Sequence, residues 1–219
     1  MAGTEQDAVA SGHADQAVIT PPAVHHGRLQ RGPDANGYRV TTFADVLRRH
    51  GATMGGIAAV GMLVPGAWPV LQATTARFVQ HPWVYLWAVA AMLLFFAFWS
   101  RRRPQPVARQ CRWILYLLFI SIAEEIAFRV MLPLLMTPSL GLLPAHVVSN
   151  LVFAALHYFT LRWKLRNCVG TFLGGMGLSH LMGQGDLVWV VLVHWLGTFL
   201  NTPFPPPRRL AQAAGGAGV

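Results

Sequence analysis

Six long apolar segments, separated by short connections, constrain this chain more than any other feature. They run at about 51–73, 82–100, 113–136, 139–161, 167–183 and 187–203. Because a helix rises 1.5 Å per residue, about 20 apolar residues cross the hydrocarbon core of a bilayer. Only 11% of the 219 residues are charged, against about 25% in soluble domains. We therefore predict an all-α membrane protein, a bundle of about six transmembrane helices.

The basic residues predict the orientation of this bundle, because cytoplasmic connections collect Lys and Arg. Basic residues occur before the first apolar segment, in every second connection and after the last segment: Arg48, Arg49, Arg101, Arg102, Arg103, Arg109, Arg112, Arg162, Lys164, Arg166, Arg208 and Arg209. The other connections carry only Arg77. Both termini are thus expected in the cytoplasm, with the protein in a bacterial inner membrane. The net charge of +9 is spread between apolar segments, so lipids rather than nucleic acid are the expected partners.

The ends of the chain differ from its apolar part. Residues 1–40 lack apolar periodicity and are expected to form a flexible cytoplasmic tail. The membrane domain is predicted at 41–204, with a short helix from Thr42 to His50 leading into the first apolar segment. Pro203 ends the last helix because proline has no N–H to donate, and 205–219 is expected to be disordered.

Two adjacent carboxylates stand out inside the third apolar segment. Within 51–203 the only other acidic residue is Asp186, which falls in a predicted loop. A charge at mid-bilayer costs about 2.5–3.5 kcal/mol on insertion scales, so Glu124 and Glu125 should face protein or water. Glu125 is four residues before Arg129, the favourable spacing for a helical ion pair. Glu124 points about 100° away from that pair. We therefore expect Glu124 to face a pocket as a general base, while the pair of Glu125 and Arg129 serves either the site or packing alone.

Polar residues in the fourth and sixth segments are the expected partners of these carboxylates. His157 and His146 are eleven residues apart and share a helix face, and Asn150 lies on that face as well. The sixth segment carries His194, with Asn201 two turns later. A single intramembrane histidine often serves only a hydrogen bond between helices. His157 and His194 gain weight from the pattern that they complete.

That pattern consists of EEIAFR beginning at Glu124, FAALH ending at His157, and His194, each on its own predicted helix. It resembles the CPBP family of CAAX proteases and bacteriocin-processing enzymes, also called Abi, whose motifs are E-E-x-x-x-R, F-x-x-x-H and H-x-x-x-N. The resemblance covers about 112–202. It implies an intramembrane endopeptidase that acts on a membrane-associated peptide or a lipid-linked protein.

The resemblance also implies roles for the motif residues. Glu124 and His157 would activate a water molecule, and His194 would orient the substrate and hold the tetrahedral oxyanion. The third motif departs from the family, because Thr198 stands at its asparagine position. Asn201, one turn further on roughly the same face, is the expected substitute, and Asn150 is a second candidate for positioning the substrate.

A cofactor is not required by this mechanism, and we favour a metal-free, glutamate-activated water. A zinc ion bound by Glu124, His157 and His194 is the alternative. Two other classes of function stay open. One is a non-catalytic scaffold or bacteriocin-immunity protein that keeps the motif for packing. The other is a small proton-coupled transporter, although the sequence shows no internal repeat to support it.

Overall fold

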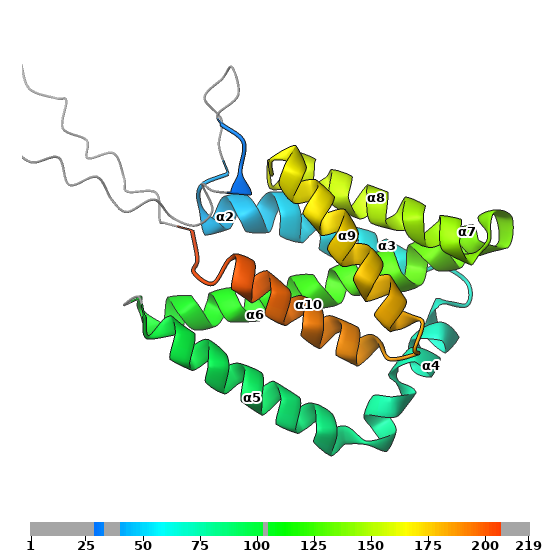
Figure 1. Cartoon of the computed structure of the whole chain (residues 1–219), viewed down its shortest axis with the longest axis horizontal. Coiled ribbons are helices and arrows are strands. Elements are labelled where there is room, and N and C mark those ends of the chain that lie inside the picture. Colours follow the sequence, from blue (N-terminus) through cyan, green and yellow to red (C-terminus); the bar gives the residue numbers. More distant parts are fainter. Residues whose placement is uncertain (1–28, 33–39, 103–104, 207–219) are drawn as a thin grey trace, which may run out of the picture.

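The computed structural model describes residues 29–32, 40–102 and 105–206, and their regular structure is helical apart from one isolated bridge between Gln30 and Trp163 (Figure 1). In chain order the elements are α2 (Phe43–Val46), the π-helical turn η1 (Leu47–Gly51), α3 (Ala52–Gly61), α4 (Ala67–Gln80), α5 (Pro82–Ser100), α6 (Val107–Glu125), the π-helical turn η2 (Ile126–Met131), α7 (Leu132–Leu140), α8 (Leu142–Thr160), α9 (Leu165–Met182) and α10 (Leu187–Asn201). The all-α prediction is confirmed for these residues. The predicted tails at 1–40 and 205–219 lie almost entirely outside them.

The prediction of one helix across 51–73 is wrong. The helix that begins at Phe43 runs through η1 and α3 and ends at Gly61, and α4 starts only at Ala67. Pro65 has no N–H and disfavours helical geometry in the residue before it. Gly66 then adopts a left-handed conformation with φ +84, which glycine takes without strain. The short helix predicted before the first segment is therefore the first part of a longer helix, which we call the N-terminal helix (Phe43–Gly61).

The last five predicted apolar segments are all helical. The third is the centre of a continuous run formed by α6, η2 and α7, so the glutamate pair lies well inside a long helix. Its inner face packs aromatic and aliphatic side chains against α10 and the N-terminal helix, in a core to which α5 also contributes. The indole of Trp195 in α10 also donates a hydrogen bond to the Ile114 carbonyl, 3.1 Å away. These contacts hold α10 beside α6, with α9 crossing next to α8 (Figure 1).

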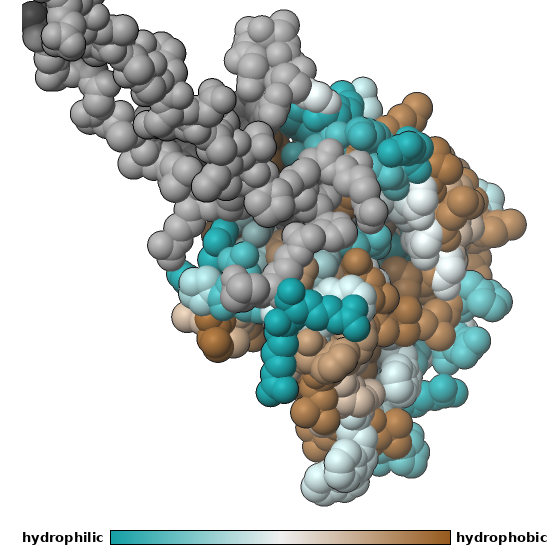
Figure 2. All heavy atoms as spheres, turned by 60° about the vertical axis from the view of Figure 1, so that its left-hand side comes forward, coloured by the Kyte–Doolittle hydropathy of each residue, from teal (hydrophilic) through white to brown (hydrophobic). Residues whose placement is uncertain are grey.

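The exterior of the molecule is unusually apolar. Among the described residues, α5 and α8 are long and apolar enough to cross a membrane, and α10 is a shorter apolar helix. Only 11% of the apolar window in α5 is buried, whereas a core helix of a soluble protein would be mostly covered. Trp83, Trp87 and Leu94 are among its exposed side chains. Figure 2 shows apolar side chains open on the visible surface. A helix that is apolar all round and left uncovered by protein fits contact with lipid.

Candidate active site

The two adjacent glutamates end α6, directly before the π-helical turn η2. Glu124 is 1% exposed and Glu125 is 0% exposed, so both carboxylates are removed from solvent. π-helical turns within α-helices are frequent at functional sites, and here the turn follows the glutamates directly. The two carboxylates point in different directions and enter two different sets of contacts.

Glu125 belongs to a buried network that joins α6–η2, α8 and α10. The predicted ion pair is present, with Arg129 Nε 3.2 Å from Glu125 Oε2. The Arg129 guanidinium also lies 4.5 Å from the centre of the Phe153 ring, which opens the FAALH motif. On the other side, His194 Nδ1 lies 2.5 Å from Glu125 Oε1. Because a carboxylate accepts hydrogen bonds, this contact places the proton of His194 on Nδ1.

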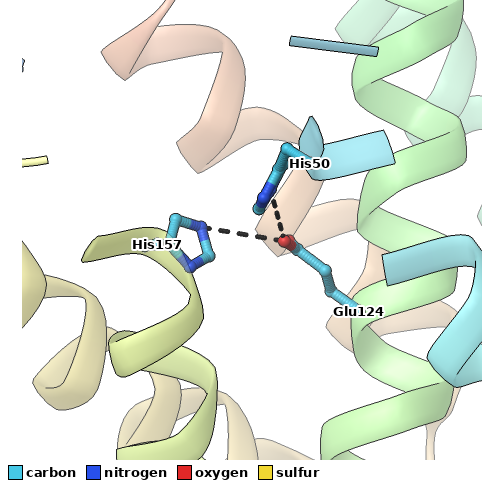
Figure 3. A group of neighbouring side chains, drawn as sticks. All are labelled: His50, Glu124 and His157. Carbon is cyan, nitrogen blue, oxygen red and sulfur yellow. Dashed lines mark ion pairs between the residues drawn. The ribbon is translucent and has the colours of Figure 1, made fainter. Parts of the chain in front are cut away.

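Glu124 faces three imidazole rings, which come from three different helices. His50 Nε2 is 2.9 Å from Glu124 Oε1, and His157 Nε2 is 3.7 Å from the same oxygen (Figure 3). His194 Nε2 is 3.4 Å from the other oxygen, Oε2. The structure therefore brings together Glu124, His157 and His194 as the sequence predicts, and adds His50.

His50 is the site residue that sequence reasoning missed. It lies in η1 of the N-terminal helix and is 3% exposed. One signal was present in the sequence. His50 directly follows Arg48 and Arg49, and His157 lies five residues before Arg162, so both histidines are near basic residues of the same predicted membrane face. A similar depth in the membrane does not by itself predict that two residues are in contact, because it does not say which helices pack against each other.

The hydrogen bonds of the two outer rings assign their protons. His50 Nδ1 is 2.8 Å from Thr160 Oγ1, and that hydroxyl donates its own hydrogen to the Leu156 carbonyl. The hydroxyl oxygen can therefore only accept from His50. His157 Nδ1 is 3.0 Å from the Phe153 carbonyl, which is also an acceptor. Both rings thus carry hydrogen on Nδ1, and in the neutral imidazole each presents an Nε2 lone pair to Glu124.

A cavity of about 490 Å³ reaches these groups. Its wall includes Glu124 and all three histidines, together with residues of α6, α9 and α10. Tyr116, two turns before Glu124, also lines it, and its buried hydroxyl has no hydrogen-bond partner among the described residues. The arrangement provides a buried carboxylate, imidazoles and a hydroxyl group around a space large enough for part of a peptide.

The two asparagines occupy different places. Asn201 lines the cavity, but its side chain is exposed and its amide donates to the Gly197 carbonyl of its own helix. Asn150 is fully buried between α8 and α9, where its amide donates to Ser179 Oγ, 2.8 Å away. It is not part of the cavity wall. Thr198, at the family's asparagine position, also lines the cavity, and its hydroxyl donates to its own helix.

The cluster of possible metal ligands in the structure contains His50 in place of the expected His194. Ligand atoms of His50, Glu124 and His157 all lie within 4.8 Å of one another. His194 lies at the second oxygen of Glu124, next to Glu125.

Comparison with known protein families agrees with this geometry. Residues 106–200 match the family described as type II CAAX prenyl endopeptidase, Rce1-like. This match supports the resemblance of the segment to CAAX proteases. The segment that matches these CAAX proteases begins at the start of α6 and contains the EEIAFR and FAALH motifs and His194, whereas His50 lies outside it. No curated protein and no solved structure matches the chain significantly.

Proposed function

We propose that this protein is an intramembrane endopeptidase that hydrolyses a peptide bond in a membrane-associated peptide or protein. The observation that carries the proposal is the buried Glu124 carboxylate, which faces His157 and His194 in a cavity. The match of residues 106–200 to the CAAX endopeptidase family supports hydrolysis as the reaction. Burying a carboxylate inside a membrane protein costs free energy, so a catalytic role explains the presence of Glu124 there better than packing does.

The chemistry follows from the groups in the cavity. Glu124 accepts a proton from a water molecule while the water oxygen attacks the carbonyl carbon of the substrate, and His157 helps to orient that water. Negative charge then develops on the former carbonyl oxygen. When the tetrahedral intermediate collapses, the C–N bond breaks and the proton on Glu124 passes to the leaving nitrogen. Water is consumed and two peptide fragments are released.

Stabilisation of the oxyanion needs a hydrogen-bond donor, which the family takes from the asparagine of its third motif. Here Thr198 occupies that position, and its hydroxyl already donates to the His194 carbonyl. The Tyr116 hydroxyl in the cavity wall has no partner among the residues described. We therefore assign oxyanion stabilisation to Tyr116 together with the imidazolium form of His194, which carries a hydrogen on Nε2 as well as on the Nδ1 that faces Glu125. We assign contact with the substrate further along the wall to Asn201.

We further propose that the protein spans a bacterial inner membrane six times with both termini in the cytoplasm. The starts of α2, α6 and α9 and the end of α10 lie toward the same end of the molecule (Figure 1). Most of the basic connections lie at that end. The cavity wall includes Leu161 and Trp163 from the connection between α8 and α9 at this end. A substrate would accordingly enter from the cytoplasmic side, with lipid around the helices.

Substitution Glu124→Gln tests the proposal, because it keeps the shape of the side chain and removes the base. Peptides that accumulate in cells lacking the protein would first be identified by mass spectrometry, and their processing then measured with each variant. The loss of a general base should slow processing by about 10²–10⁴-fold. The exposed His180 provides a control, since His180→Gln should leave processing unchanged. Normal processing by Glu124→Gln at normal protein level would refute the protease mechanism and favour a scaffold.

A further inference from the structure

A short segment that precedes the N-terminal helix contributes to the wall of the cavity. Gln30 in this segment forms an antiparallel bridge with Trp163, in the connection between α8 and α9 (Figure 1). Leu29 and Trp163 both line the cavity. We propose that residues 162–164, which we call the docking edge, bind the main chain of an extended peptide, and that the protein's own residues 29–32 occupy this edge in the structure. That peptide would be the substrate, so the proposal rests on the proposed function.

The contacts at the docking edge are made mainly by main-chain groups. The Lys164 N–H donates a hydrogen bond to the Leu29 carbonyl, 2.8 Å away. The Arg31 N–H donates to the Arg162 carbonyl, 2.7 Å away. The side-chain amide of Asn167 also donates to the Leu29 carbonyl, at 2.7 Å. A peptide that pairs with an exposed edge gains affinity from such main-chain hydrogen bonds, so the docking edge can accept peptides of different sequence.

The docking edge is attached directly to a residue of the active site. The Trp163 N–H donates to the His157 carbonyl at 3.4 Å, and the centres of the two side-chain rings lie 4.9 Å apart. Arg162 has a φ of +56, the only positive φ outside glycine among the described residues. A left-handed conformation is unfavourable for arginine and persists where surrounding contacts hold it, often at functional sites. A peptide on the docking edge is thus held next to a histidine that faces Glu124.

The side chains of the segment indicate which residues a docked peptide would carry. Leu29 contributes to the cavity wall beside Leu161 and Trp163, where an apolar side chain fits. The Arg31 guanidinium lies 3.7 Å from the centre of the Tyr158 ring and donates to the Tyr158 carbonyl at 3.0 Å. A cation over an aromatic ring is stabilised by the charge distribution of the ring. We therefore expect a peptide with an apolar residue at the position of Leu29 and a basic residue two positions later.

Occupation of the docking edge by the protein's own segment lowers the affinity for other peptides. A substrate can use the edge only in molecules whose residues 29–32 have left it, so the apparent Kd rises by the reciprocal of that fraction. The contacts of Arg31 with Tyr158 hold the segment in place, and neither side chain belongs to the docking edge. Arg31→Ala should thus free the edge and leave its hydrogen-bond donors intact.

Binding of a labelled peptide to the full-length protein in detergent tests the docking edge without any cleavage. The probe has the sequence of residues 26–35, and its fluorescence anisotropy gives the Kd. Arg31→Ala should lower this Kd by about 5–50-fold relative to the wild type.

A proline substitution then removes one main-chain donor of the docking edge. Lys164 has a φ of −64, which proline adopts without strain, but proline has no N–H to donate to the peptide. Combined with Arg31→Ala, Lys164→Pro should raise the Kd of the probe by about 3–10-fold. Lys164→Ala in the same background is the matched control, because it removes the side chain and keeps the N–H, and it should leave the Kd unchanged.

Thermal unfolding of each variant shows whether it is folded. Asn167→Leu, which removes only the side-chain amide, should also raise the Kd by about 3–10-fold and tests the edge even if Lys164→Pro does not fold. An absence of probe binding by Arg31→Ala would overturn the proposal, and so would unchanged affinity in the folded Lys164→Pro and Asn167→Leu variants.

Failure of the docking edge and failure of the protease function give different results. Binding that depends on the Lys164 N–H, without cleavage of any peptide, would support the docking edge and count against the protease. Processing that is lost in Glu124→Gln but has the same KM with and without Lys164→Pro would support the protease and overturn the docking edge.

Discussion

Substitution Glu125→Gln probes the buried network behind the cavity. Glu125 and Arg129 are both 0% exposed in their side chains, and Nε and Oε2 are 3.2 Å apart. Glutamine keeps the volume of the side chain, and its carbonyl oxygen can still accept a hydrogen bond from His194 Nδ1. It cannot neutralise Arg129. The substitution therefore separates the charge balance of the network from its hydrogen bonding to His194.

The magnitude follows from the distance and the burial. At an effective dielectric constant of about 20, two unit charges about 3.2 Å apart attract by about 5 kcal/mol. Removal of one partner from a buried ion pair typically costs about 3–5 kcal/mol, because the other charge stays buried without compensation. Glu125→Gln should therefore lower the free energy of unfolding by about 3–5 kcal/mol. The double variant Glu125→Gln/Arg129→Met, which removes both charges, should recover most of this loss.

Reversible unfolding in mixed detergent micelles measures these differences as a double-mutant cycle, with Arg129→Met as the fourth species. Non-additivity is the decisive quantity, since it isolates the interaction between the two side chains. If Glu125→Gln lies within about 1 kcal/mol of the wild type, or if the double variant is as unstable as the sum of the single variants, the charge balance is not what stabilises this network.

Two further substitutions test packing and chemistry. A Cβ at Gly175 would overlap the buried Asn150 amide and approach Arg129 Nη2 to 3.1 Å. Gly175→Ala should therefore lower the melting temperature and the free energy of unfolding, the latter by about 1–3 kcal/mol, whereas Gly177→Ala should change neither because the space around Gly177 is open. Equal melting temperatures for the two variants would contradict the tight contact of α8 and α9. Tyr116→Phe should lower kcat by about 10²–10³-fold with little change in stability, as expected for loss of an oxyanion donor, and unchanged kcat would remove Tyr116 from that role.

The third, fourth and sixth apolar segments show what patterning along the chain can predict. Their hydrophobic length places EEIAFR, FAALH and His194 on separate helices. The four-residue spacing of Glu125 and Arg129 also predicts their ion pair, because that contact forms within one helix. The helix bounds of the first apolar segment were harder to predict, because Pro65 and Gly66 interrupt the segment and its helix begins before the apolar residues do.

The sequence by itself determined that the chain is helical and which polar residues of the apolar segments must face protein or water. Both follow from hydrophobicity and helical spacing, which depend only on residues close together in the chain. Only the tertiary structure decided which side chains meet Glu124. His50 and His157 are far apart in the chain, and their convergence on one carboxylate depends on how the N-terminal helix packs against α6 and α8. The same packing left Asn150 outside the cavity and turned His194 toward both glutamates. Contacts between helices depend on shape and on the whole set of neighbours, which no local pattern in the sequence specifies.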